Sequence, residues 1–113
     1  ELFWQDNYQD ALNYLFKAEE EKRWLSAEDQ SQLLSRIAEV FTNLGDYTQA
    51  ATYQYDALKL SESVNDSLGI AYGHWSLSRV FWYSGQLDKA YEEAYQAYEL
   101  FTTLEITWKR LKS

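Results

Sequence analysis

Hydrophobic residues recur at helical spacing along nearly the whole chain, in segments separated by short polar breaks. Ser26 followed by Asp29 reads as a helix start, because a side-chain oxygen at this point accepts a hydrogen bond from a free backbone amide. The segment 65–67, Asn-Asp-Ser, offers the same oxygens to a later helix. Gly45 and Gly85 each follow an apolar stretch and suit the turn after a helix, where φ becomes positive. The pattern predicts an all-α chain.

These signals divide the chain into antiparallel helix pairs. We expect helices over 7–24, 27–44, 47–64, 67–84 and 87–103, with a further helix beginning in 107–113. The corresponding units of one repeat domain, 1–113, are a partial repeat 1–24, repeats 27–64 and 67–103, and the start of the next helix at 107–113. Stacked pairs of this kind form a right-handed α-α superhelix, here of about two and a half repeats. We expect the array to continue beyond both ends.

Internal similarity supports the same division. Residues 37–50 lie over residues 77–90 at an offset of about 40, and each copy reaches another alanine seven positions later, at Ala57 and Ala97. Residues 6–11 hold part of a third copy. Similarity at a fixed period is typical of repeat architectures, in which each unit buries its apolar face against the next.

Composition narrows the function. Proline and cysteine are absent and glycine occurs four times, which favours long helices and excludes disulfides and thiolate metal ligands. The net charge of −8 opposes phosphate and anionic lipid, so we expect no nucleic-acid or membrane partner. No apolar run approaches the roughly 20 residues that span a bilayer. We expect a soluble segment; the compartment stays open, with the cytoplasm favoured.

The repeated positions resemble the tetratricopeptide repeat family, which places large, small and aromatic residues at fixed spacing. In the middle repeat the pattern falls on Leu34, Ile37, Ala38, Phe41, Gly45, Tyr47, Ala50, Gln54 and Ala57, where Gln54 is the poor match. In the last repeat it falls on His74, Leu77, Ser78, Phe81, Gly85, Leu87, Ala90, Ala94 and Ala97. The resemblance implies a non-enzymatic scaffold that binds a protein or peptide.

Two features depart from the usual family pattern. The period of about 40 exceeds the common 34, and resembles the long-period branch of Pins-type polarity adaptors, kinesin light chains, MalT-like regulators, Rap-type peptide receptors and some histidine-kinase sensor regions. The position that is usually asparagine in chaperone-binding members is Glu39, and Arg79 in the next repeat. We therefore do not expect a chaperone tail as the ligand. A ligand-sensing segment of a bacterial histidine kinase or transcription regulator, and a module that self-associates into a homo-oligomer through its exposed repeat ends, stay open as alternatives.

In this architecture the first helix of each repeat lines the inner groove, so its side facing away from the second helix is the candidate binding surface. The expected peptide-binding residues are Arg36, Glu39, Asn43, Tyr72, Trp75, Arg79, Trp82 and Tyr83. Tryptophan, tyrosine and arginine dominate binding hot spots. Two interpretations of the aromatic residues stay open: they anchor a ligand, or Trp75, Trp82 and Phe3 pack between helices or against a neighbouring repeat.

The chain shows no pattern of catalytic or metal-binding residues. His74 is the single histidine and falls on a core-facing position, so we interpret it as a packed or hydrogen-bonded structural residue. The acidic runs 19–21 and 92–93 lie on the outward helices and are interpreted as solvated. A glycine-rich phosphate loop and the spacings of metal ligands are absent from the sequence. We expect no catalytic residue, metal or cofactor.

Overall fold

The computed structural model describes the backbone of residues 2–112 and the side chains of residues 7–21 and 23–112. The described chain forms five α-helices and one short 3₁₀ segment, with no strand. The elements are α1 (Leu2–Glu20), η1 (Lys22–Trp24), α2 (Ala27–Leu44), α3 (Tyr47–Ser63), α4 (Ser67–Tyr83) and α5 (Leu87–Lys112). The predicted all-α fold is confirmed. None of the described helices is both long and apolar enough to cross a membrane.

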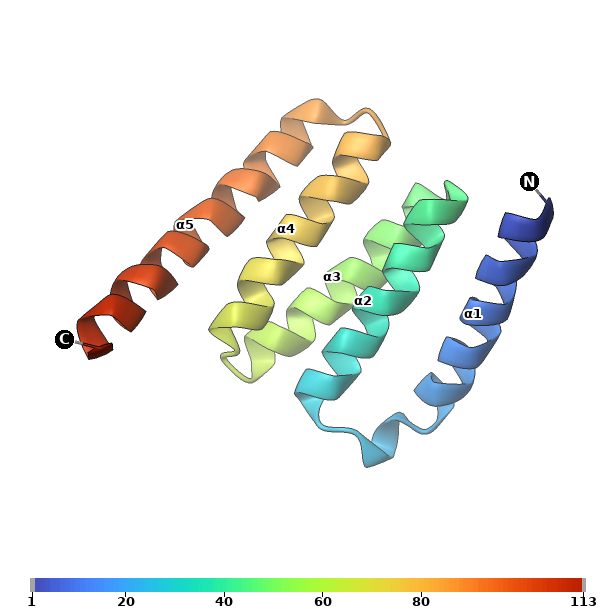
Figure 1. The fold of residues 1–113 in the computed structure, drawn as a ribbon, viewed down its shortest axis with the longest axis horizontal. Coiled ribbons are helices and arrows are strands. Elements are labelled where there is room, and N and C mark those ends of the chain that lie inside the picture. The colour runs from blue at the N-terminus through green and yellow to red at the C-terminus, as the bar shows by residue number, and fades with distance from the viewer. Residues whose placement is uncertain (1, 113) are drawn as a thin grey trace.

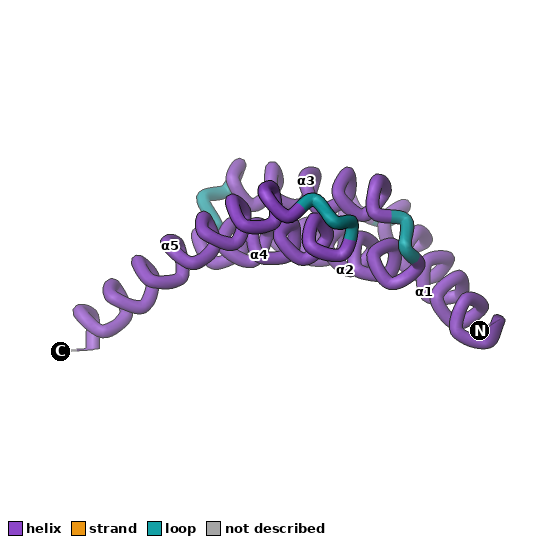
Figure 2. The backbone as a smooth tube through the Cα atoms, turned by 90° about the horizontal axis from the view of Figure 1, so that it is seen from above, coloured by secondary structure: helices purple, strands orange, loops and turns teal. Residues whose placement is uncertain are grey.

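The helices are stacked side by side as an arch. Figure 1 shows α2 and α4 near the viewer, with α3 behind and between them. From above, α3 lies on the outer side of the arch and both ends of the chain turn toward the side of α2 and α4 (Figure 2). The molecule measures 52 × 37 × 21 Å. The first helices of the two complete pairs therefore lie together on the inner side, as the repeat pattern predicted.

Local capping explains most helix boundaries. Gly45 and Gly85 have φ of +85° and +82°, so each leaves its helix through the left-handed region. Ser26 and Asp66 each accept a hydrogen bond from the backbone N–H three residues later, at 3.1 and 3.0 Å. These predicted stops and starts are confirmed, and the predicted bounds of α2 agree with the structure.

The last helix is longer than predicted. We expected it to end at 103 and a new helix to begin in 107–113, but α5 continues without a break to Lys112. The intervening residues, Leu104, Glu105 and Ile106, include no glycine or proline that would stop a helix. The predicted break is therefore wrong, and the last part of α5 continues past the helix that it packs against.

The first helix also differs from its predicted bounds. α1 begins at Leu2 instead of residue 7. Gly45 and Gly85 follow the ends of α2 and α4, but the matching repeat position in α1 is Asp6, which is not a glycine. Without a glycine the chain continues as one helix. α1 then ends at Glu20, and the expected last turn is the 3₁₀ segment η1.

Apolar packing between consecutive helices forms the core. Leu58 of α3, Leu77 and Phe81 of α4 and Ala90 of α5 make one buried cluster, against which Ile70 packs. At the other end three rings from α1, α2 and α3 meet: Phe16, Phe41 and Tyr53 have centroids 5.6–6.4 Å apart. Each helix thus packs on the next, which is the packing of a repeat solenoid.

Candidate binding groove

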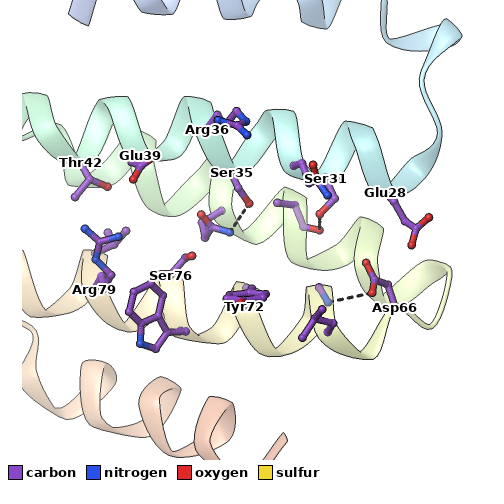
Figure 3. Close-up of a pocket in the computed structure, with 18 residues that line it drawn as sticks. Glu28, Ser31, Ser35, Arg36, Glu39, Thr42, Asp66, Tyr72, Ser76 and Arg79 are labelled. Atoms are coloured by element: carbon purple, nitrogen blue, oxygen red, sulfur yellow. Dashed lines mark hydrogen bonds between the residues drawn. The ribbon is translucent and has the colours of Figure 1, made fainter. Parts of the chain in front are cut away.

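A groove of about 680 Å³ lies between α2 and α4 on the inner side of the arch. The facing sides of these two helices form its walls, and α3 contributes Gln54 and Ala57 to its floor. Figure 3 shows side chains from both walls directed into the space between the helices. A cavity of this volume falls within the usual range of ligand sites, about 300–1,000 Å³.

The polar groups at the floor of the groove are used by the fold itself. Gln54 Nε2 donates a hydrogen bond to Ser35 Oγ at 2.9 Å. Ser31 Oγ donates to Ala57 O at 2.9 Å and lies 2.9 Å from Ser61 Oγ. These bonds join α2 to α3, so the hydroxyl of Ser31 and the amide nitrogen of Gln54 are already used by the fold.

The α4 wall is aromatic and partly open to solvent. Tyr72 and Trp75 are 54% and 46% exposed although both line the groove. The ring of Tyr72 packs edge-on against Phe101 of α5, with centroids 5.2 Å apart. The guanidinium carbon of Arg79 lies 5.2 Å from the centroid of the Trp75 ring, a cation–π contact. These contacts hold the two rings in place while part of each stays available to a ligand.

The charges of the groove are separated along its length. Glu28 and Asp66 lie at the end where α2 and α4 begin, whereas Arg79 points across toward Glu39 near the other end (Figure 3). Arg36 lines the α2 wall between these ends. Among the described residues, neither Glu28, Arg36 nor Glu39 has an ion-pair partner within 4.0 Å. The groove therefore presents both signs of charge to solvent.

The comparison with protein families agrees with this geometry. The family model for the tetratricopeptide repeat matches residues 29–103, which span most of both helix pairs and every groove residue except Glu28. The chain belongs to the tetratricopeptide repeat family. Repeats of this family serve in general as protein-interaction scaffolds and are typically non-catalytic. No curated protein sequence matches the chain.

The residues that the sequence predicted to bind a partner lie in two hollows. Those that line the groove are Arg36, Glu39, Tyr72, Trp75 and Arg79. Trp82 and Tyr83, together with Arg79, line a second hollow of about 330 Å³ between α4 and α5. Asn43 lines neither. The side chain of Phe3 is outside the described residues.

The exposure of the tryptophans bears on the two interpretations that the sequence left open. Trp75 and Trp82 are 46% and 64% exposed, so neither belongs to the core that the described residues form. Both are therefore accessible from solvent on the described chain.

Sequence reasoning missed the acidic end of the groove. Glu28 and Asp66 lie at helix starts. Asp66 was interpreted only as part of a helix start, and Glu28 was not singled out. The mismatch of Gln54 with the family pattern was a usable signal, since this side chain reaches from α3 to Ser35 of α2 at the groove floor.

One interpretation of an acidic residue is wrong. Glu93 was expected to be solvated, but its side chain is 15% exposed and Oε1 lies 2.6 Å from Nδ1 of His74. Glu93 lies between Ala90 and Ala97 on the buried side of α5, so it must face α4. His74 is hydrogen-bonded at a helix interface, in agreement with the structural role expected for it, and neither residue lines the groove.

Metal binding has no support among the described residues. They contain no group of three or more histidine, cysteine, aspartate or glutamate side chains that could hold a metal ion. The walls of the groove carry aromatic rings, hydroxyl groups and charged side chains.

Proposed function

We propose that this chain binds an extended segment of a partner protein in the groove between α2 and α4. The observation that carries the proposal is the groove itself, about 680 Å³ in volume, with Tyr72 and Trp75 partly exposed on one wall. Exposed aromatic rings in a concave site are favourable anchors, because they bury a large area at a small cost in side-chain entropy. The family's general role as an interaction scaffold supports the same function.

The groove has dimensions and chemistry that suit a peptide. It is open along α2 and α4, which run side by side (Figure 1), so that a chain could lie lengthwise between them. Its floor is already hydrogen-bonded, so a ligand gains most from contacts with the two walls. An apolar side chain of the ligand would pack on Tyr72 and Trp75, which lie one turn apart on α4.

The charges restrict the ligand further. Glu28 and Asp66 favour a basic residue at one end, although Asp66 Oδ1 is already engaged with the N–H of Gly69 at 3.0 Å. Arg36 and Arg79 favour an acidic residue farther along the groove. The best-fitting ligand is therefore a peptide with an apolar residue between a basic and an acidic one.

A display library of linear peptides, selected on the wild-type chain, tests this function. The affinities of the selected peptides are then measured by fluorescence anisotropy for Trp75→Ala, Arg79→Ala and the double variant. We expect at least a tenfold loss for Trp75→Ala, since truncating a true anchor costs about 2 kcal/mol. Tyr14→Ala is the matched control, because Tyr14 is an exposed aromatic residue on α1 that does not line the groove.

Circular dichroism of each variant separates loss of binding from loss of folding. If the selected peptides bind the folded Trp75→Ala and Arg79→Ala variants as tightly as the wild type, the groove is not the binding site. Failure to select any peptide whose affinity falls in these groove variants would also overturn the proposal.

A further inference from the structure

A second surface, distinct from the groove, extends along the whole length of α5. Its members recur at alternating intervals of four and three residues, the spacing of a helix-pairing seam. They are Leu87, Tyr91, Ala94, Tyr98, Phe101, Glu105, Trp108 and Lys112. All of these are exposed except Phe101, which is half-buried against α4, and Tyr91 is 75% exposed. We call this surface the α5 seam.

The α5 seam also continues beyond the rest of the fold. α5 has 26 residues and is therefore about 39 Å long, whereas α4 has 17. Figure 1 shows the end of α5 passing the start of α4. Trp108 and Leu111 in this final part are 61% and 76% exposed. Large apolar side chains in such numbers on one exposed helix mark an interaction surface.

The α5 seam differs from the matching surface of α3, against which α4 packs. There, α4 approaches α3 closely through Gly69 and Gly73: a Cβ on Gly73 would lie 2.9 Å from Leu58 Cδ1, and one on Gly69 would lie 2.7 Å from Ser61 Oγ. One repeat later, Leu58 is replaced by Tyr98 and Ser61 by Phe101. These larger rings prevent an equally close approach, so α5 is unsuited to seat a following helix in the way that α3 seats α4.

The spacing of the seam is symmetric about the midpoint between Glu99 and Leu100. We propose that the α5 seam binds the same seam of a second copy of this chain, antiparallel, about a two-fold axis at that midpoint. Each position then faces its counterpart across the axis: Tyr91 faces Trp108, Ala94 faces Glu105, Tyr98 faces Phe101 and Leu87 faces Lys112. Such an interface is closed and self-complementary, as in most homodimers.

The hollow between α4 and α5 fits this arrangement. Trp82, Tyr83, Leu87 and Tyr91 line that hollow of about 330 Å³. In the antiparallel pair, Trp108 of the second copy lies level with Tyr91, beside the hollow. A large side chain that enters a hollow on the facing helix is the packing that specifies a helix pair.

Charge along α5 favours the antiparallel direction. The first part of the helix carries three acidic residues, Asp88, Glu92 and Glu93, and one basic residue, Lys89, whereas its last turn carries Lys109, Arg110 and Lys112. Antiparallel pairing brings the basic end of each copy beside the acidic part of the other. Parallel pairing would instead place the two basic ends together, where like charges repel.

Disulfide trapping tests the direction and the register, and the chain is suited to it because it has no cysteine. Tyr91→Cys and Trp108→Cys chains are oxidised separately and as a mixture, and the products are identified by mass. We expect a heterodisulfide in the mixture and none in either chain alone, since the two copies of position 91 would be about 25 Å apart along the helix axis. A disulfide between two copies of position 91 indicates parallel pairing and overturns the proposal.

Sedimentation velocity over a range of concentrations tests the dimer itself. We expect the wild type to form a dimer and Tyr98→Glu to weaken it at least tenfold, because two like charges would meet near the two-fold axis. Tyr14→Glu is the control, since Tyr14 is 73% exposed on α1 and away from α5. A wild type that stays monomeric, or grows beyond dimers, overturns the proposal, as does an equal effect of the two variants. Peptide binding by the groove does not depend on this result.

Discussion

His74 and Glu93 are joined across the α4–α5 interface, with Nδ1 of His74 2.6 Å from Oε1 of Glu93. The carboxylate oxygen accepts, so Nδ1 carries the donated hydrogen. Both side chains are largely buried, at 18% and 15% exposure. The contact joins the two helices of the last repeat at positions that are 19 residues apart in sequence.

We expect His74→Ala to lower the free energy of unfolding by about 1–2 kcal/mol, because it leaves the Glu93 carboxylate partly buried without its donor. Urea denaturation followed by circular dichroism measures this loss. Glu92→Gln, at the exposed neighbouring position, is expected to change stability by less than about 0.5 kcal/mol. A double-mutant cycle with Glu93→Gln isolates the contact, and additive losses would show that the two side chains do not interact.

The conformation of Gly45 makes a second prediction. Its φ of +85° is left-handed, and a Cβ at this position meets no atom within 4 Å, so the cost of a side chain there comes from the backbone alone. We expect Gly45→Ala to lower stability by about 1 kcal/mol. Gly45→Asn should lose less, because asparagine tolerates this region, as Asn65 does here with φ of 55°. Equal losses for alanine and asparagine would argue against a backbone origin.

The buried serines between α2 and α3 make a third prediction. Ser31→Ala removes the donor to Ala57 O and the partner of Ser61 Oγ, both at 2.9 Å. We expect a loss of about 1–2 kcal/mol in the free energy of unfolding, since buried polar atoms lose their partner. Ser76→Ala is the matched control, a serine on the groove wall for which the structure shows no hydrogen bond to a described residue. Similar losses in both variants would contradict the hydrogen-bond explanation.

Tyr53 makes stability depend on alkaline pH. Burial, with smaller contributions from the nearby Glu19 and Asp56, raises the pKa of Tyr53 above its ordinary value of 10.0. The folded chain therefore holds the phenol proton more tightly than the unfolded chain does. Below about pH 10 the Tyr53 phenol is protonated in both the folded and the unfolded chain, so this group does not make the free energy of unfolding depend on pH. At higher pH the unfolded chain ionises first, and the free energy of unfolding falls.

Urea denaturation at about pH 9 and about pH 11 measures this effect in the wild type and in Tyr53→Phe. We expect a smaller fall in stability between the two pH values for Tyr53→Phe, which keeps the stacked ring next to Phe41 but has no ionisable proton. Tyr14→Phe, at an exposed position, serves as the control. A fall in Tyr53→Phe that equals that of the wild type would contradict the assignment.

The candidate groove could be predicted from the sequence only in part. Helical periodicity places Tyr72, Trp75 and Arg79 on one face of α4, and the structure shows all three in the groove. Asn43 was expected beside them, but each residue turns the helix by about 100°, and the groove ends at the preceding Thr42. Which residues belong to the rim depends on how α2 and α4 are rotated toward each other, and a single helix does not encode this rotation.

The sequence by itself determined the helical class, the repeat and most helix ends, because these depend on groups within about four residues of each other. The left-handed turn at Gly45 and the cap at Ser26 are such local features. Only the tertiary structure decided that Glu93 faces His74 and that Gln54 reaches Ser35. It also showed that α5 runs on to Lys112. The two contacts join different helices, so they depend on how those helices pack, which local sequence signals do not specify.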